Sequence, residues 1–464
     1  MKIVDLEQQL KIYFPAWDSL TAAAAASGCE LYLVGGALRD LFREKKISDL
    51  DFVCPVADMA FWEETILGYV KGRFITMGSG AERHSTRRLV GPELTIDIAA
   101  LNGPDLDCDL KRRDFTINAM AFALREQQFH DPHAGREALA AGQIISVASE
   151  NMQDDPLRIV RAVRFMLEIE GALSPATQDE MRAAVSGLDG VARERFTVEL
   201  NHIFASNKSG CGLRELAAVG ALQKIFPPLA GLAGLEQNNF HHLDALQHTL
   251  AVIDSLDQLC QKNPLALPVP AAVDCILLKW TALFHDVGKA LSKTEDPDTG
   301  TIHFFGHERF SVHLARETLS GFALGKDFLR RLERLIENHL RPLLLNLDSC
   351  KEKALRRLVF DLEDDLYLLL LHTFADLEAT RGRDPQPRQQ NLIRLSRRLK
   401  EIYELERETF IKPLISGKDL IALGLEPGPA IGTIIRMIHQ KQLAGDIGSK
   451  EEALAVAREL LLEN

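Results

Sequence analysis

Two aspartates, Asp49 and Asp51, stand two residues apart in a segment where polar and apolar residues alternate, Ser48–Val53. The alternation predicts a β-strand, whose period of two puts both carboxylates on one face and Leu50 and Phe52 on the other. Two adjacent carboxylates repel each other unless a cation lies between them. Mg²⁺ prefers oxygen ligands of this kind and commonly takes further ligands from phosphates. The pair therefore predicts a magnesium site for chemistry on phosphate groups.

A glycine turn lies shortly before the aspartates. The apolar run Leu31–Val34 predicts a buried strand, Gly35 and Gly36 follow it, and helical spacing then begins, with Arg39 in its first turns. Glycine allows the backbone to approach an anion, and the first N–H groups of a helix point toward it. Arg39 is placed to bind a triphosphate with two hydrogen bonds. The alternative is a plain turn before a surface helix and two solvated aspartates, but the combination at this spacing favours metal-assisted nucleotidyl transfer.

Further polar residues are candidates for the same site. In the segment 110–122, Arg113 is placed to take a phosphate oxygen and Asp114 to accept a ribose hydroxyl. The alternative is that Asp114 caps a helix while the basic residues beside it are solvated. Asp97, on a predicted neighbouring strand, is either a third carboxylate of the site or an ordinary strand residue.

A stripe of arginines follows Pro156, a residue that suits the first position of a helix and makes Asp155 the expected N-cap. Arg158, Arg161 and Arg164 come at intervals of three and form a slanting stripe on that helix. A carboxylate beside a guanidinium offers an acceptor and donors to the edge of a base. An N-cap followed by a salt-bridged helix face explains the pattern equally well.

A second group of possible metal ligands lies in the C-terminal half, on or directly after predicted helices: His248, His285, Asp286 and Asp376. A lone histidine on a helix is usually a packed or surface residue. Imidazoles and carboxylates grouped in this way suit a divalent transition metal. His307 and His339 would extend the group to two metals.

The pattern of the whole chain predicts an N-terminal part with both strands and helices, which would position the first group of residues, and a helical part after it, which would position the second. Helical spacing covers 5–28 and 57–70, and strands are expected at 74–76, 88–90 and 94–99. After about residue 146 strand patterns almost vanish, and helices follow one another through short loops. The expected fold class is α+β.

The chain has 464 residues, more than one core normally holds, and a net charge of −12. This charge argues against unspecific nucleic-acid binding by the whole surface. Residues 381–400 hold seven basic residues against one acidic, which indicates either a local basic track or a solvated helix face. The seven cysteines include no Cys-x-x-Cys pair, and the sequence has neither a membrane-spanning run nor a signal peptide. We expect a cytoplasmic protein with no structural zinc site and no contact with membranes.

Four segments together resemble the motifs of the class II tRNA nucleotidyltransferase and bacterial poly(A) polymerase family, in the right order: 31–53, 111–119, 131–139 and 154–165. Residues 417–447 are similar to the tail of that family, and the pattern 248–376 resembles an HD-type phosphohydrolase domain. The resemblance implies four parts: a polymerase-β-like nucleotidyltransferase head (1–145), an all-α neck with the base-selecting motif (146–215), an HD-like body (216–380) and a helical, tRNA-binding tail (381–464).

The resemblance implies template-free addition of nucleotides to RNA 3′ ends. Asp49 and Asp51 would bind Mg²⁺. The nucleotide's triphosphate and ribose would be held by four residues of the head: Gly36, Arg39, Arg113 and Asp114. The base would be read by two residues of the neck and supported by two more: Asp155 and Arg158, then Arg161 and Arg164. Asp154 stands where the family commonly has glutamate, and 191–200 matches a segment that braces the neck.

The most detailed expectation concerns which nucleotides are added. Gly72-Arg73-Phe74 is only a fragment of the signature of the poly(A) polymerases, which favours tRNA as the substrate. The connection between 95–100 and the Arg113 motif is shorter, by roughly a dozen residues, than the loop of enzymes that build the whole CCA end. We therefore expect an enzyme that adds two cytidines from CTP and works with a separate A-adding enzyme. The alternatives are a full CCA-adding enzyme, which also uses ATP, and a poly(A) polymerase. The HD-like body would hold a second divalent metal and act as a phosphohydrolase, or serve as an inactive scaffold for RNA docking.

Overall fold

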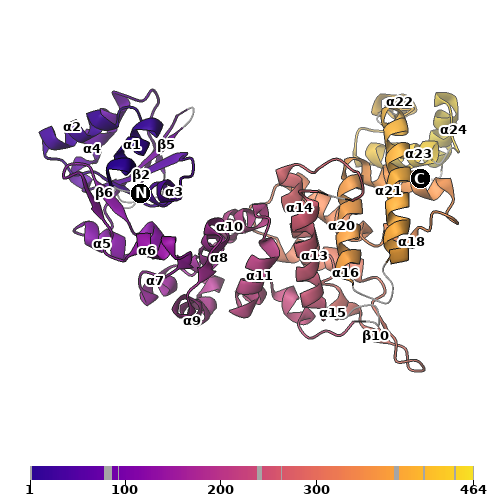
Figure 1. Ribbon diagram of the computed structural model, residues 1–464. Coiled ribbons are helices and arrows are strands. Elements are labelled where there is room, and N and C mark those ends of the chain that lie inside the picture. The colour runs from indigo at the N-terminus through magenta and orange to yellow at the C-terminus, as the bar shows by residue number, and fades with distance from the viewer. Residues whose placement is uncertain are drawn as a thin grey trace. The chain divides into compact units, whose positions relative to one another are not determined.

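The computed structural model describes residues 3–77, 86–91, 94–237, 243–262, 264–380, 386–410, 413–443 and 446–462 (Figure 1). The chain forms two compact units. The first comprises Met1–Leu200 and Glu215–Ile225, and the second comprises Asn201–Arg214 and Phe226–Asn464. The first unit contains the main sheet and the second is almost entirely helical, so the expected α+β fold is confirmed.

A seven-stranded sheet forms the centre of the head, in the order β3-β4-β5-β2-β1-β6-β7. Its strands are β1 (Tyr32–Val34), β2 (Asp49–Cys54), β3 (Ile75–Met77), β4 (Thr86–Val90), β5 (Thr95–Ala100), β6 (Ala121–Ala123) and β7 (Gln128–His130). Only β2 and β5 pair in parallel, and the other neighbours are antiparallel. The strands expected at 74–76, 88–90 and 94–99 are therefore present, with small shifts in their ends.

The alternation in β2 sets the two faces of the sheet as expected. Leu50 and Phe52 are buried in the core, whereas Asp49 is exposed. Trp17 and Trp62, from helices on the same side as Leu50 and Phe52, belong to that core. The helices and turns of the head are α1 (Ile3–Tyr13), α2 (Trp17–Ser27), α3 (Gly36–Phe42), η1 (Val56–Asp58), α4 (Met59–Leu67), α5 (Leu106–Lys111), η3 (Thr116–Asn118) and α6 (Gly135–Ala140).

Two expectations for the head are wrong in detail. The single helix expected over 5–28 is two helices that separate around Pro15, because a proline restricts the residue before it and cannot donate to the preceding turn. The alternative for 110–122, a helix capped by Asp114, does not form: Thr116–Asn118 make the short turn η3, and Ala121 and Phe122 enter the short strand β6. This strand is buried between β1 and β7, and a strand buried on both faces is as continuously apolar as a buried helix.

The chain after the head is mainly helical. Its first elements are β8 (Gln143–Ile144), α7 (Ser149–Asp154), α8 (Arg158–Ile169), β9 (Ala172–Leu173), α9 (Pro175–Ala184), η4 (Val185–Gly190), α10 (Arg193–Ala205), α11 (Ser209–Ala218) and α12 (Ala221–Ile225). Helix α8 begins at Arg158, two residues later than expected, and Asp155 follows α7 as its C-cap. The prediction that Asp155 caps the arginine helix is therefore wrong.

The second unit consists of helices with one short hairpin. Its elements are η5 (Pro227–Leu232), α13 (Ala245–Leu259), α14 (Ala272–Phe284), α15 (Lys289–Ser292), β10 (Thr294–Glu295), β11 (Ile302–His303), α16 (His307–Thr318), α17 (Lys326–Asn338), α18 (Arg341–Leu344), α19 (Glu352–Leu362), η6 (Glu363–Asp365), α20 (Leu366–Ala379), α21 (Gln386–Phe410), α22 (Gly417–Ala422), α23 (Pro429–Leu443) and α24 (Lys450–Leu462). The last three helices share a small core of their own. Part of the predicted basic track, 381–385, lies outside the described residues. No helix in the described part of the chain is long and apolar enough to cross a membrane.

Candidate active site

The glycine turn brings the backbone close to two charged side chains. Gly35 has a φ of 74° and precedes α3. A Cβ atom built on it would lie 3.4 Å from Asp51 Oδ2 and 3.4 Å from Arg113 Nη1. The positive φ favours glycine at this position, while the two contacts of an added Cβ atom would be at the edge of ordinary van der Waals distance. The phosphate cradle expected at this glycine turn stays a prediction.

Asp51 and Asp97 stand side by side on parallel strands, in register between β2 and β5. Arg88 on β4 forms a fork with Asp97, with Nε at 2.8 Å and Nη2 at 2.6 Å from its two carboxylate oxygens. Burial, and then the nearby charge of Asp97, raise the pKa of Asp51 to about 6. Asp49 is exposed and accepts a hydrogen bond of 2.8 Å from Ser48 Oγ. Crowded carboxylates of this kind fit a divalent cation, which would relieve their repulsion.

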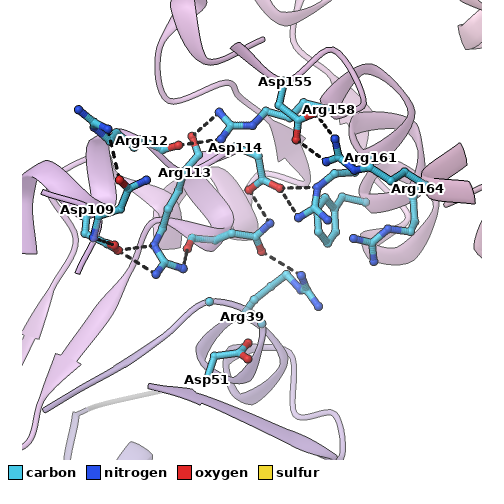
Figure 2. Close-up of a pocket in the computed structure, with 16 residues that line it drawn as sticks. Arg39, Asp51, Asp109, Arg112, Arg113, Asp114, Asp155, Arg158, Arg161 and Arg164 are labelled. Atoms are coloured by element: carbon cyan, nitrogen blue, oxygen red, sulfur yellow. Dashed lines mark hydrogen bonds and ion pairs between the residues drawn. The ribbon is translucent and has the colours of Figure 1, made fainter. Parts of the chain in front are cut away.

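A pocket of about 520 Å³ opens beside this corner and is lined largely by charged groups (Figure 2). Nine of the ten residues that the sequence singled out for catalysis and nucleotide binding line it: Gly36, Arg39, Asp51, Arg113, Asp114, Asp155, Arg158, Arg161 and Arg164. Asp49 does not. The pocket contains seven arginines and four aspartates, so its lining carries an excess of positive charge that suits a polyphosphate.

Asp114 is a buried junction of the pocket. One carboxylate oxygen accepts hydrogen bonds from the Phe115 N–H at 2.8 Å and from Asn118 Nδ2 at 3.0 Å. The other accepts from Nη2 and Nε of Arg161, at 2.6 and 3.0 Å. Burial alone would raise the pKa of Asp114, but Arg161 and Asn118 outweigh it and lower the pKa below its ordinary value. Asp114 therefore remains an ionised anchor for Arg161.

Hydrogen bonds and ion pairs extend from Asp114 into a closed ring of side chains. The ring runs through seven residues in this order: Arg39, Asn118, Asp114, Arg161, Glu199, Arg164 and Glu168, which returns to Arg39. Glu199 on α10 is 6% exposed and bridges Arg161 Nη1 at 3.2 Å and Arg164 Nε at 2.6 Å. Glu168 receives Arg39 Nη2 at 2.7 Å. Arginines of α3 and α8 are thereby held in fixed positions.

Phe165 supports the arginines of this ring. The guanidinium carbons of Arg39, Arg161 and Arg164 lie 4.9, 5.3 and 3.9 Å from the centre of its ring. Cations are attracted to an aromatic face at such distances. The pocket thus holds its arginines by carboxylates on one side and an aromatic ring on the other.

The two residues expected to read a base both have partners within the chain. Arg195 Nη1 and Nη2 donate to the two oxygens of Asp155, at 3.1 and 2.8 Å. Arg158 Nη2 and Nη1 donate to the main-chain carbonyls of Arg112 and Arg113, at 2.8 and 3.3 Å. Figure 2 draws Asp155 and Arg158 together at one end of the pocket.

Sequence reasoning missed several residues of this site. Glu199 and Arg195 lie within 191–200, a segment to which the sequence analysis gave only a general bracing role. Their spacing of four was an available signal, because residues four apart share one face of a helix. Asn118 and Glu168 bind Arg39 across 79 and 129 residues of sequence, which no local pattern predicts. Their contacts four residues away, with Asp114 and Arg164, were the available local signal.

The second unit brings together the histidines and aspartates expected to bind metal. Two groups of possible ligands have ligand atoms within 4.8 Å of one another: His248, His285 and Asp286, and then Asp286, His307 and His339. Asp286 is common to both groups. Asp376 joins the first, because its Oδ1 lies 2.9 Å from His248 Nε2.

The hydrogen bonds of three histidines prepare them as ligands. The Nδ1 atoms of His285, His307 and His339 lie 2.7 to 2.8 Å from main-chain carbonyl oxygens. A carbonyl only accepts, so Nδ1 carries the proton and Nε2 keeps a lone pair when the ring is neutral. Burial, followed by the charges of His285 and His307, lowers the pKa of His339 to about 3, so this ring is neutral. The donor set fits a divalent transition metal.

A pocket of about 280 Å³ leads to this cluster. Lys289 lines it and lies 2.6 Å from Asp286 Oδ2. His372, which the sequence reasoning missed, lies one helical turn before Asp376, and both of its ring nitrogens are buried without a hydrogen-bond partner among the described residues. The exposed ring of Phe305 stacks on His303 at the pocket lining, with ring centres 4.9 Å apart.

A polar pocket with a carboxylate corner and fixed arginines defines the first unit as a nucleotidyltransferase head, and comparisons with known proteins give the same class. Residues 31–145 match the model of the poly A polymerase head domain, 172–232 that of the probable RNA and SrmB-binding site of polymerase A, and 245–378 that of the HD domain. The chain is an enzyme of the nucleotidyltransferase class.

Relatives that match nearly the whole chain give the family. The chain is 33% identical to an A-adding tRNA nucleotidyltransferase of Deinococcus radiodurans, over 91% of this chain and 94% of the relative. It is 31% identical to a CC-adding tRNA nucleotidyltransferase of Thermus thermophilus, over 92% of each. The chain belongs to the tRNA nucleotidyltransferase family.

A solved structure has the same fold. The Thermotoga maritima CCA-adding enzyme complexed with tRNA aligns with 96% of this chain and 95% of its own, with a TM-score of 0.59 and 19% identity. The polymerase-β-like head and HD-like body expected from the sequence are confirmed at the level of the fold.

Proposed function

We propose that this chain adds cytidines to the 3′ end of tRNA from CTP and releases pyrophosphate. The observation that carries the proposal is one pocket of the head, which joins Asp51 to a ring of fixed arginines and to the pair Asp155 and Arg158. The residues proposed to bind phosphate and those proposed to read the base thus line one cavity, as the transfer of a nucleotide requires. The enzyme would act in the cytoplasm.

The chemistry is an in-line displacement at phosphorus. The terminal 3′-hydroxyl oxygen bonds to the α-phosphorus of CTP while the bond to the β-phosphate oxygen breaks, and the hydroxyl proton passes to solvent. Asp49 and Asp51 would hold Mg²⁺, which when bound polarises the phosphate and neutralises the leaving charge. Arg39 and Arg113 line the pocket beside Asp51 and would bind the triphosphate, with Gly36 at its backbone. Asp114 would position the ribose through Arg161, since its own oxygens already have partners.

Asp155 and Arg158 would select the base. Cytosine presents an amino donor next to ring and carbonyl acceptors, which matches a carboxylate acceptor next to a guanidinium donor. Arg161 and Arg164 would support this end of the pocket through their ring of carboxylates. The tRNA would be recognised through its backbone and shape, by the helical parts of the chain.

The short connection Leu101–Asp105 between β5 and α5 supports addition of two cytidines only. A mobile segment that lets the base site change from C to A would need more chain here. A relative named CC-adding supports the same reading. Completion of the end would then need a separate A-adding enzyme. The relative named A-adding supports the second candidate, which is addition of the terminal adenosine alone, and a full CCA-adding enzyme is a third.

Incubation with a tRNA that lacks its last three nucleotides distinguishes these activities. With CTP and ATP together, the proposed enzyme extends this tRNA by two residues, resolved on a denaturing gel. A product three nucleotides longer identifies a CCA-adding enzyme. Extension from ATP of a tRNA that already ends in CC, without use of CTP, identifies an A-adding enzyme. Asp51→Asn should abolish the addition, while Asp179→Asn, exposed on α9, should not.

For the second unit we propose a metal-dependent phosphohydrolase, carried by the buried cluster around Asp286. His248, His285, Asp286 and Asp376 would hold the metal, and a phosphate ester would enter through the adjoining pocket, beside Lys289. Hydrolysis of 2′,3′-cyclic and terminal nucleotide phosphates with Mn²⁺, Ni²⁺ or Co²⁺ tests it. Loss of hydrolysis in His285→Ala, with nucleotide addition retained, is the expected result. Hydrolysis by neither protein would leave a scaffold for RNA docking.

A further inference from the structure

The side chain of Asp155 has one hydrogen-bonding partner among the described residues, and that partner is Arg195. The guanidinium grips both carboxylate oxygens as a fork, at 3.1 and 2.8 Å. Asp155 follows α7 as its C-cap and stands before the proline turn into α8, so no regular helix fixes its side chain. A fork of two parallel hydrogen bonds sets the plane of a carboxylate, which one bond cannot do.

The position of Arg195 is itself fixed by its helix. Arg195 and Glu199 are four residues apart on α10 and share a face. The buried Glu199 binds Arg161 and Arg164 of α8. The same face of α10 therefore holds the ring of arginines through Glu199 and holds Asp155 through Arg195. The Asp155 carboxylate can therefore change its orientation only if the fork is lost or α10 shifts.

The fork leaves Asp155 able to accept further hydrogen bonds. An ionised carboxylate has about four acceptor positions, and Arg195 occupies two of them. Asp155 lines the pocket. An ionised carboxylate cannot donate, so it attracts the amino group of cytosine or adenine and repels the carbonyl oxygen that uracil and guanine present at the matching position.

Arg158 completes the arrangement with a donor of equally restricted position. The carbonyls of Arg112 and Arg113 hold two of its nitrogens. A base that enters this end of the pocket therefore meets an acceptor and a donor that are both fixed before it arrives. Fixed polar groups discriminate strongly, because a wrong base leaves them unpaired.

We propose that Arg195 is a specificity-determining positioning residue, which orients the Asp155 carboxylate so that bases with an amino group are accepted and bases with a carbonyl are rejected. The inference rests on the proposed role of Asp155 in base selection. It assigns to Arg195 the choice of CTP and ATP over UTP and GTP. It does not assign the choice between CTP and ATP, for which Asp155 offers both bases the same acceptor.

Nucleotide addition to a tRNA that lacks its CCA end, with CTP and with UTP, tests this role in Arg195→Ala and Arg195→Lys. The ratio of kcat/KM for CTP to that for UTP should fall about 10- to 100-fold in Arg195→Ala. Arg195→Lys offers a charge without the fork and should restore the ratio in part. Arg182→Ala is the matched control, since Arg182 forms an ion pair with Asp179 on the exposed face of α9, and it should keep the wild-type ratio.

The outcomes separate the two proposals. Wild-type protein that adds no nucleotide from CTP would overturn the cytidine-adding function. Wild-type activity with an unchanged CTP-to-UTP ratio in Arg195→Ala and Arg195→Lys would overturn the role of Arg195 alone. If Arg195→Ala does not fold, Arg195→Lys decides, because a ratio equal to that of the wild type would contradict a need for the fork.

Discussion

Asp51 and Asp97 lie directly opposite each other on the parallel strands β2 and β5. Their side chains share one face of the sheet, and Arg88 neutralises Asp97 but not Asp51. Burial and the charge of Asp97 raise the pKa of Asp51 to about 6. The protein therefore keeps a carboxylate where its charge is unfavourable in the absence of a cation, as sites that bind metals do.

The first prediction is that this carboxylate lowers the stability of the metal-free protein at neutral pH. The pKa of Asp51 is about 6 in the folded state against 3.8 as the ordinary value, so the folded state binds its proton more tightly. The free energy of unfolding should therefore fall as pH rises from 4 to 6.5, by about 1–3 kcal/mol from this group. Asp51→Asn should remove that part of the slope and raise the Tm at pH 7.5 by several degrees.

Thermal unfolding in EDTA across this pH range measures the effect, with the exposed Asp49 changed to Asn as the control. Asp49→Asn should leave most of the slope, because the charge of Asp49 raises the pKa of Asp51 less than burial and Asp97 do. Excess Mg²⁺ should stabilise wild-type protein more than Asp51→Asn, because a ligand of the folded state stabilises it. Equal slopes in wild type and Asp51→Asn would show that Asp51 does not titrate here.

The sequence predicted the parts of this site that depend on local pattern. The strand alternation placed Leu50 and Phe52 in the core, and the apolar run and the two glycines gave the strand, turn and helix start around Gly35. It could not predict the ring through Glu199, because this depends on how α10 packs on α8. The N-cap assigned to Asp155 failed for the same reason. Pro156 is a good first helical residue by local rules. The Asp155 side chain binds Arg195 instead of capping a helix, and α8 begins at Arg158.

The second prediction concerns Glu199. Glu199→Gln leaves Arg161 and Arg164 with a neutral partner in a partly buried site, which should cost about 1–3 kcal/mol of stability. The arginines should also lose their fixed positions, so the KM for CTP should rise by an order of magnitude or more. Denaturant unfolding and steady-state kinetics measure the two effects, and Glu180→Gln on α9 is a control at a glutamate outside the ring. An unchanged KM in a folded Glu199→Gln variant would contradict a positioning role for the ring.

The third prediction concerns Gly187, which lies against the proline turn that follows Asp155. A Cβ atom on Gly187 would lie 2.5 Å from Cγ of Pro156, too close to be accommodated without a shift. Gly187→Ala should therefore displace the proline turn and weaken selection of CTP over UTP several-fold, although residue 187 does not line the pocket. Gly190→Ala, which would meet nothing within 4 Å, should behave as wild type. An equal loss of addition with CTP and with UTP, which leaves their ratio unchanged, would contradict a role of this turn in selecting the nucleotide.

The fourth prediction concerns the cradle. Gly35 combines a φ of 74° with a ψ of −137°, a region that residues with side chains essentially avoid. Gly35→Ala should lose about 1–3 kcal/mol of stability. Its methyl group would also touch Asp51 and Arg113, at 3.4 Å from each, and relief of the backbone strain would shift the turn beside them, so nucleotide addition should fall at least tenfold. Gly28→Ala also has a positive φ but open space around it, so it should lose some stability and keep its activity. Similar activity of the two variants would show that the approach to Asp51 and Arg113 does not matter.

The last prediction counts metals in the second unit. Asp286 belongs to both groups of possible ligands, whereas His307 belongs to only one and His248 only to the other. Protein loaded with Mn²⁺ or Co²⁺, freed of excess metal and measured by elemental analysis, should hold two ions in this unit when both groups bind. The head site must be removed from the count by Asp51→Asn, which serves as the parent for every variant. His307→Ala should then lose one ion, and Asp286→Asn both. His303→Ala is the control, since His303 lines the same pocket but belongs to neither group.

A parent that holds one ion, lost in His248→Ala but kept in His307→Ala, would reduce the site to a single metal. Metal content in Asp286→Asn equal to that of the parent would exclude a shared site at Asp286, since removal of a ligand common to both groups must weaken both.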